Sequence, residues 1–367
     1  MRYDVSKLSL PDLFAPVATA TAALTRLDER IARSPIGDGW VQRAHFADAC
    51  ASLWVDGELV HLEDLVLHDV GMGIRAPSHE LTIAQDVLRS RRSIFSHPPG
   101  WALSADGLAK LRGRGIEELA KSAAATFAVE DEPFSDEADG LDDPFDLNFA
   151  EIDAVLARSE ALLSDARERT PSGARERDAF VYEPDWNEDE RLAEWRVARS
   201  QAEGLPAVLR AAVLLDAWNM LQVLQHAPWL GRLLAASLLR EAGVTPAHLA
   251  PVNLGLKQIS RERRASRDRD TRLLAILDGL TAGAEAGLKE HDRLLLARQQ
   301  MQHRISGRRI SSKLPQLIDL VLAKPMVSAG MIASELGVTP QGALKIAGEL
   351  NLRELTGRDR FRAWGVL

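Results

Sequence analysis

The chain has 367 residues, of which 46% are hydrophobic and 27% charged, as in folded proteins and unlike disordered ones. Its formal net charge of −8 gives no overall basic field that would attract nucleic acid or an anionic membrane. The single cysteine, Cys50, excludes a disulfide scaffold and a zinc site built from several cysteines, and no apolar run reaches the length of a membrane span.

Four helices are predicted in the first hundred residues. Ala, Leu, Glu and Arg dominate the chain, and the alternating pattern of strands is rare before its C-terminal part, which indicates a mainly α protein. A turn cluster, SPIGDG, ends the first helix, and Ser78 is a suitable N-cap for the fourth. The predicted ranges are 10–34, 41–54, 58–68 and 78–95.

The middle of the chain is predicted to be an acidic linker or long loop. Residues 130–153 contain eleven acidic residues and no basic one, together with Pro133, Gly140 and Pro144. Such a composition favours solvation over a packed core. The alternative is a segment that binds a protein partner or mimics DNA.

Helices resume after the linker. Residues 151–165 are predicted to be helical, and residues 205–226 are apolar on nearly every face, which predicts a buried central helix. A helix over 229–242 is closed by Gly243, and a long helix, or two, follows over 273–303.

The C-terminal segment carries the most specific pattern, that of a winged helix-turn-helix. Three short helices are predicted, and Ala333 is the small residue where the first helix of the motif meets the second. Gly337 suits a turn with left-handed φ, and Thr339 is an N-cap followed by Pro340. Two strands then form a wing. The predicted ranges are 313–322, 328–336 and 340–350 for the helices, and 352–356 and 361–366 for the strands.

Candidate DNA contacts lie on the second helix of this motif and on the wing. Glutamine and lysine side chains reach base edges or phosphates, and arginines on a wing reach the backbone or the minor groove. The candidate residues are Thr339, Gln341, Gly342, Lys345, Arg358, Arg360 and Arg362. Residues 313–367 have a net charge of only +2, so a winged helix used for protein contacts stays open. The basic segment 257–272 is either a second phosphate contact or a charged linker.

No sequence motif indicates a metal or phosphate site. The nine histidines form no H-E-x-x-H pair, and neither a phosphate-binding G-x-x-x-x-G-K-[ST] loop nor a G-x-S-x-G elbow occurs. His61 and His68 share a helix face with nearby carboxylates, which is typical of a solvated face.

Residues 224–243, LQHAPWLGRLLAASLLREAG, resemble the core helix of Fic/DOC proteins, whose pattern is H-P-F-x-[DE]-G-N-G-R-x-x-R-L-L. Residues 52–57, SLWVDG, look like the S-x-x-x-E-G inhibitory helix that lies N-terminal to many Fic cores. The long helix and the winged helix resemble the tail of multidomain bacterial Fic proteins. The resemblance implies an ion pair between Asp56 and Arg232, because in that family the inhibitory carboxylate pairs with the last arginine of the core motif.

The catalytic residues of that pattern are not matched. Aligned without gaps, the family's histidine falls on Leu221, its metal-binding acid on Gln225 and its G-N-G-R loop on residues 226–229. Leucine accepts no proton, and Pro228 has no N–H for an anion. His226 would serve as the base only with a deletion in the loop, which would leave no anion-binding nest. We therefore expect a degenerate site without catalytic residues, metal or cofactor.

We interpret the chain as a mainly α protein, with a Fic-like helical domain followed by a small winged-helix domain whose wing has two strands. An N-terminal helical region and an acidic linker precede the Fic-like core with its long helix. These parts, with the winged helix as the fourth, span residues 1–127, 128–150, 151–303 and 313–367.

The predicted function is DNA binding in transcription regulation, without enzymatic activity. Double-stranded DNA is the expected partner, with room for a protein partner at the acidic segment and for a homodimer, and with no membrane. A cytoplasmic location is expected because the chain has one cysteine and no signal peptide. Two alternatives remain: a divergent nucleotidyl transferase that moves an adenylyl group to a protein hydroxyl, and a protein-interaction module without DNA binding.

Overall fold

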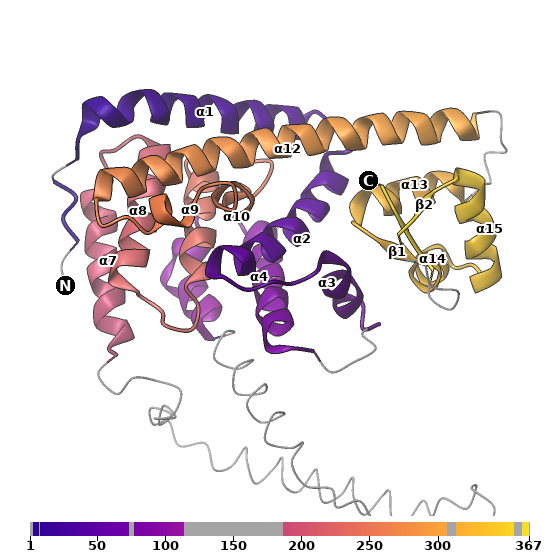
Figure 1. The fold of residues 1–367 in the computed structure, drawn as a ribbon, viewed down its shortest axis with the longest axis horizontal. Helices are drawn as coiled ribbons and strands as arrows, with labels where there is room; N and C mark the ends of the chain where they lie inside the picture. The colour runs from indigo at the N-terminus through magenta and orange to yellow at the C-terminus, as the bar shows by residue number, and fades with distance from the viewer. Residues whose placement is uncertain are drawn as a thin grey trace, which may run out of the picture. The chain divides into compact units, whose positions relative to one another are not determined.

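The computed structural model describes residues 3–6, 8–72, 77–113, 186–306, 313–355 and 362–366. The predicted acidic linker and the predicted helix over 151–165 therefore lie outside the described residues. The described parts of residues 1–124 and 187–367 form one compact unit (Figure 1).

The N-terminal part is helical, as predicted. α2 begins four residues before its expected start and ends at Gly57, whose φ of 99° is left-handed. The hydroxyl of Ser78 caps α4 by accepting a hydrogen bond from the Leu81 N–H at 3.3 Å. The elements are α1 (Leu10–Ala32), α2 (Gly37–Asp56), α3 (Leu62–Asp69), α4 (His79–Ser96) and the 3-10 helix η1 (Trp101–Leu103).

The second group of helices packs with the first, and together they form what we call the helical body, α1 to α12. α8 is the buried central helix, but it ends at Leu221 and not at His226, because Gln222 adopts a left-handed conformation with φ of 46°. α7 was not predicted, since its sequence continues a charged stretch. The elements are α7 (Glu188–Gln201), α8 (Ala207–Leu221), α9 (Trp229–Glu241), α10 (Val252–Leu256), α11 (Arg261–Arg264) and α12 (Arg269–Ile305).

The long helix α12 packs against several other helices of the helical body. It lies beside α1 over most of the length of α1 (Figure 1) and also packs against α10 and α8. α10 approaches α12 so closely that a Cβ on Gly255 would lie 1.8 Å from the carbonyl oxygen of Gly279. Glycine is required there for two backbones to meet.

The C-terminal part has the topology of a winged helix. The three strands are antiparallel in the order β1-β3-β2, with Trp364 of β3 opposite Val327 on one side and Glu354 on the other. The prediction of a wing with two strands missed β1, which has only two residues. The elements are α13 (Leu314–Ala323), β1 (Val327–Ser328), α14 (Ala329–Leu336), α15 (Pro340–Leu350), β2 (Arg353–Glu354) and β3 (Ala363–Gly365).

The described part of the chain contains no helix that is both long and apolar enough to cross a membrane. Among the same residues, no three His, Cys, Asp or Glu side chains gather in a way that would hold a metal ion.

Candidate nucleic-acid interface

The turn between α14 and α15 is built from local backbone chemistry. α14 ends at Gly337, whose φ of 61° is left-handed. The Thr339 hydroxyl then accepts a hydrogen bond from the Gly342 N–H at 3.1 Å, which caps α15, and Pro340 takes the first helical position. These three residues do what the sequence predicted, and they fix the direction in which α15 leaves the turn.

The buried side of α15 settles which residues face outward. Ala343, Ala347 and Leu350 are buried against the other helices of the winged helix. Gln341, Leu344, Lys345 and Gly348 are exposed and fall on one face, because residues three and four apart are neighbours on a helix. We call these four residues the outer face of α15.

The structure places the predicted residues in three different situations. Gln341 and Lys345 lie on the outer face. Thr339 and Gly342 bind each other at the cap, where the Thr339 hydroxyl accepts from the Gly342 N–H and keeps its own O–H as a donor, and Gly342 has no side chain. Arg358 and Arg360 lie outside the described residues.

Arg362 lies on the wing, where an acidic neighbour already engages it. Its Nε and Nη2 donate to one carboxylate oxygen of Glu354, at 2.9 and 2.6 Å. Its guanidinium also lies 5.6 Å from the centre of the Trp364 ring. A phosphate would have to compete with this carboxylate, which makes Arg362 a weaker candidate than Lys345.

Leu344 was missed by the sequence analysis. Its side chain is 39% exposed on the outer face, between Gln341 and Lys345. Apolar side chains on a recognition helix contact the methyl group of thymine. The available signal was its position, three residues after Gln341 and outside the stripe of small and apolar residues that pack inward.

The amino-terminal end of α15 is electrostatically open to anions. No acidic residue lies in the first turn of α15, so no carboxylate offsets the positive end of the helix dipole. Phosphate groups favour such helix ends. The outer face therefore combines a basic residue, an amide, an apolar side chain and a positive helix end.

Three charged residues of the helical body hold the winged helix, and we call them the Arg43 joint: Arg43, Glu290 and Arg293. Arg43 donates to the carbonyl oxygens of Val321 and Lys324, at 3.2 and 2.7 Å. Arg43 and Arg293 both donate to the carbonyl oxygen of Val366, and both pair with Glu290. Burial lowers the pKa of Arg43, and the Glu290 carboxylate opposes that shift. The joint ties α2 and α12 to the end of α13 and to the residue after β3.

Most arginines of the basic segment 257–272 are used within the helical body. Arg272 forms a two-point contact with Asp216, at 2.6 and 3.0 Å. Arg263 pairs with Asp278, and Arg264 donates to the carbonyl oxygens of Ile259 and Val55. These contacts favour a structural role for the segment over a second phosphate contact.

Asp56 and Arg232 are in direct contact. Both oxygens of Asp56, the last residue of α2, accept from the Arg232 guanidinium at 2.9 and 2.6 Å. The same guanidinium also donates to the hydroxyl of Ser52 at 2.9 Å. The Arg232 side chain is 5% exposed and that of Asp56 26%. A nearly buried, bidentate pair of this kind joins α2 to the first turn of α9.

Leu221 and Pro228 are two of the positions that align with the catalytic pattern. Leu221 is buried in the core at the end of α8, and Pro228 directly precedes α9. The surroundings of Arg232 thus hold an arginine–carboxylate contact without a proton acceptor at the matched position.

Two family models match the sequence in separate regions. One, described as "Protein of unknown function (DUF1612)", matches residues 180–306, which include α7 to α12. The other, described as "HTH DNA binding domain", matches residues 314–367. Neither comparison shows a Fic-like character for the helical body.

A relative covers the full length. The "Uncharacterized protein y4cF" of Sinorhizobium fredii (strain NBRC 101917 / NGR234) is 57% identical over 380 aligned residues, which span all of both chains. The chain therefore belongs to the same family as y4cF, with a helix-turn-helix DNA-binding domain at its C-terminal end.

Proposed function

We propose that the protein is a non-enzymatic regulator of transcription that binds double-stranded DNA through the outer face of α15. One observation carries the proposal: a winged helix that matches a DNA-binding family presents Gln341, Leu344 and Lys345 together on the exposed side of its second motif helix. Gln341 is suited to base edges, Lys345 to phosphate and Leu344 to thymine methyl groups. The wing, with Arg358, Arg360 and Arg362, would contact the backbone beside this helix.

We further propose that the helical body is a Fic-like domain that has lost its catalytic residues. The Asp56–Arg232 contact supports this, because the resemblance requires it between segments 176 residues apart in the sequence. A buried helix, a short loop and a second helix that starts just before Arg232 also fit the Fic pattern. A structural role explains why the pair persists without a catalytic histidine, since an unpaired buried arginine costs about 3–5 kcal/mol.

Selection of duplexes by the full-length protein tests the DNA proposal. From a random pool, we expect an enriched sequence, and Gln341→Ala should change the preferred base at one or two positions. A lost base contact costs about 1–3 kcal/mol, or roughly 5- to 150-fold in affinity for the selected site. Gln299→Ala, an exposed glutamine of α12, is the matched control and should change neither. A selection that returns no enriched sequence would favour a protein-interaction module.

Labelled ATP with Mg²⁺ or Mn²⁺ tests the absence of enzymatic activity. We expect no transfer of label to the protein or to added proteins, because leucine replaces the base. Transfer that survives Leu221→Ala but is lost in Arg232→Ala would contradict the proposal and favour a divergent nucleotidyl transferase.

A further inference from the structure

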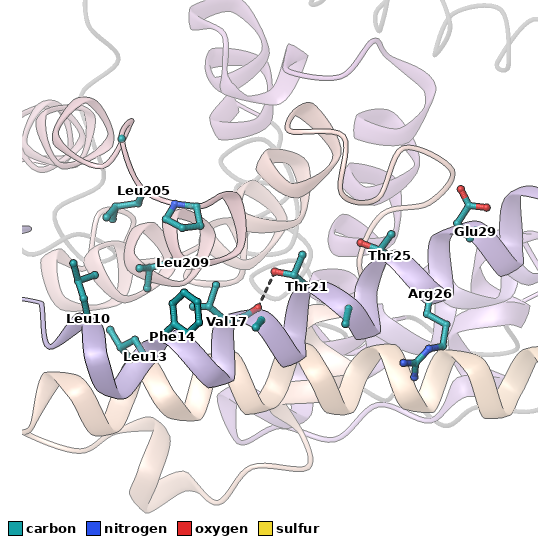
Figure 2. Close-up of a pocket in the computed structure, with 14 residues that line it drawn as sticks. Leu10, Leu13, Phe14, Val17, Thr21, Thr25, Arg26, Glu29, Leu205 and Leu209 are labelled. Atoms are coloured by element: carbon teal, nitrogen blue, oxygen red, sulfur yellow. Dashed lines mark hydrogen bonds between the residues drawn. The ribbon is translucent and has the colours of Figure 1, made fainter.

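An open apolar groove runs along α1, between α1 and the start of α8. No residue of the winged helix lines it. Figure 2 shows Leu10, Phe14 and Thr21 on α1, with Leu205 and Leu209 on the opposite side. The groove has a volume of about 870 Å³. Phe14 is 78% exposed and Leu10 52%, although neither has a polar group to solvate.

The exposed side of α1 lacks the charges that a surface helix normally carries. No charged residue occurs from Leu13 to Thr25, in a chain of which 27% is charged. Five of these residues are exposed in addition to Thr25, namely Phe14, Ala15, Ala18, Thr19 and Ala22. A surface helix usually has a polar face toward solvent. The apolar exposed face of α1 is therefore suited to contact with a partner surface.

The exposed part of α1 in the groove begins with large apolar side chains and continues with small ones. Leu10 and Phe14 form the large half, and Ala18, Thr21 and Ala22 form the small half. Beyond the small half, the far end of the groove is lined by Thr25, Arg26 and Glu29. A two-fold symmetric contact requires one surface to complement itself. When a second copy is related to the first by a two-fold axis perpendicular to α1, the large half of each α1 lies against the small half of the other. The surface then complements itself.

We infer that α1 forms a homodimer interface, in which the α1 helices of two copies pack antiparallel about a two-fold axis near Ala18. With a rise of 1.5 Å per residue, Phe14 and Ala22 each lie about 6 Å from Ala18 along the helix. Phe14 of each copy would therefore enter the small half of the groove, beside Thr21 and Ala22 of the partner subunit.

Charge favours the antiparallel arrangement over the parallel one. Asp12 and Arg26 lie six and eight residues from Ala18 on opposite sides, so each Asp12 would come within about 3 Å, measured along the helix, of Arg26 of the partner subunit. Within the described residues no carboxylate pairs with Arg26, whereas the next arginines, Arg30 and Arg33, pair with Asp292 and Glu29. Parallel helices would place like charges side by side.

This interface goes beyond the proposed DNA binding and is independent of it. A dimer would present two winged helices, as is common among proteins that read two-fold symmetric sites. Its failure would leave the outer face of α15 unaffected, and a failure to bind DNA would leave the dimer unaffected.

Sedimentation of the full-length protein tests the inference. At tens of micromolar we expect twice the chain mass of 40.3 kDa for the wild type, and Phe14→Glu should weaken the dimer by at least about 30-fold, as for a central aromatic anchor. Leu59→Glu is the control, because Leu59 is also a well-exposed apolar residue, at 68%, and lies outside the groove. A monomeric wild type, or a Phe14→Glu protein that remains as dimeric as Leu59→Glu, would overturn the inference.

Two further variants test the antiparallel geometry. Ala18→Cys should form an intermolecular disulfide on oxidation, and the native thiol should not compete because burial raises the pKa of Cys50 to about 12. Asp12→Arg and Arg26→Asp should each weaken the dimer, and the double exchange should restore it. A dimer that does not cross-link at Ala18→Cys, or a double variant weaker than either single one, would rule out this interface. A monomer that binds a fatty acid in the groove would contradict it as well.

Discussion

The caps that begin α14 and α15 in the winged helix are contacts over three residues, from Ser328 to Met331 and from Thr339 to Gly342. In the helical body they span 43 residues between Asp48 and Arg91, and 176 between Asp56 and Arg232. Ser328 is the one buried polar residue in the described part of the winged helix, whereas the body buries many charged ones. The small domain is shaped by local caps and turns, and the large one is held by ion pairs between distant helices.

This difference separates two ways of making a specific fold. Caps and turns act within a short segment, so they set where the helices of the winged helix begin and end without help from distant residues. Buried ion pairs are costly to break but are made only when distant helices have already met. The Arg43 joint is one place where the two regions meet; α13 also packs against α2 and α12, and Arg304 of α12 donates to the carbonyl oxygen of Leu350.

The largest effect is expected at the buried pair of the body. Asp48→Ala leaves Arg91, which is fully buried and whose pKa is already lowered by burial, without its carboxylate. It also removes the acceptor for Asn253 and Leu254. We expect a loss of about 3–5 kcal/mol in the free energy of unfolding, measured with urea. Asp278→Ala, which breaks the exposed pair with Arg263, should cost about 0–1 kcal/mol. Equal losses of stability in the two variants would contradict the distinction between buried and exposed ion pairs.

The Arg43 joint gives the next largest effect. Arg43→Met leaves the carbonyl oxygens of Val321 and Lys324 without this donor, and we expect a loss of about 2–3 kcal/mol. Because the winged helix is locally built, calorimetry should then show it melting separately from the body. A single transition at an unchanged temperature would show that the joint does not connect them.

Acid should destabilise the body through a buried histidine. Burial, with Arg91 and Arg92 nearby, holds the pKa of His45 well below its usual value, and neither ring nitrogen has a partner among the described residues. The unfolded chain binds a proton below about pH 6.5 while the folded one does not, so stability is full above that pH and falls below it.

Between pH 7.5 and 5.5 this one histidine accounts for a loss of about 1.4 kcal/mol. His45→Phe should reduce the pH dependence of the urea midpoint by that amount, because phenylalanine keeps an aromatic ring beside Phe95 and does not titrate. An unchanged pH dependence would show that His45 takes up its proton while folded.

The smallest effect is expected at a local contact. Thr339→Ala removes the cap of α15 and should destabilise the winged helix by about 1 kcal/mol, with the body unchanged. Gln341→Ala, two residues on and exposed, is the matched control and should leave stability within about 0.5 kcal/mol. Hydrogen exchange of the α15 amides measures the effect of both variants. An equal loss of protection in the helical body would show that the cap does not act only within the winged helix.

The same difference explains what the sequence predicts well. The residue types of Gly337, Thr339 and Pro340 are enough to predict a turn and a helix cap. The helices of the winged helix were therefore predicted to within a few residues. β1 was missed because two residues give no alternating pattern. The end of α8 was missed because Gln222 adopts a left-handed conformation that glutamine rarely takes.

Contacts between residues far apart in the sequence cannot be predicted from local sequence patterns. Nothing in the sequence around Asp48 or Arg91 indicates that they meet. The contact between Asp56 and Arg232 was expected only through the resemblance to Fic proteins. The outer face of α15 was predicted in part, because Gln341 and Lys345 have suitable chemistry, while Leu344 required knowledge of which side of the helix is buried.

The salt dependence of DNA affinity tests the central claim most directly. The full-length protein is titrated against its selected duplex between 50 and 200 mM salt, and the slope of log affinity against log salt is measured for wild type and Lys345→Ala. If Lys345 contacts a phosphate, the variant should have a slope smaller in magnitude by about 0.9, while Lys289→Ala on α12 leaves it unchanged. Identical slopes for Lys345→Ala and wild type would contradict DNA binding through the outer face of α15.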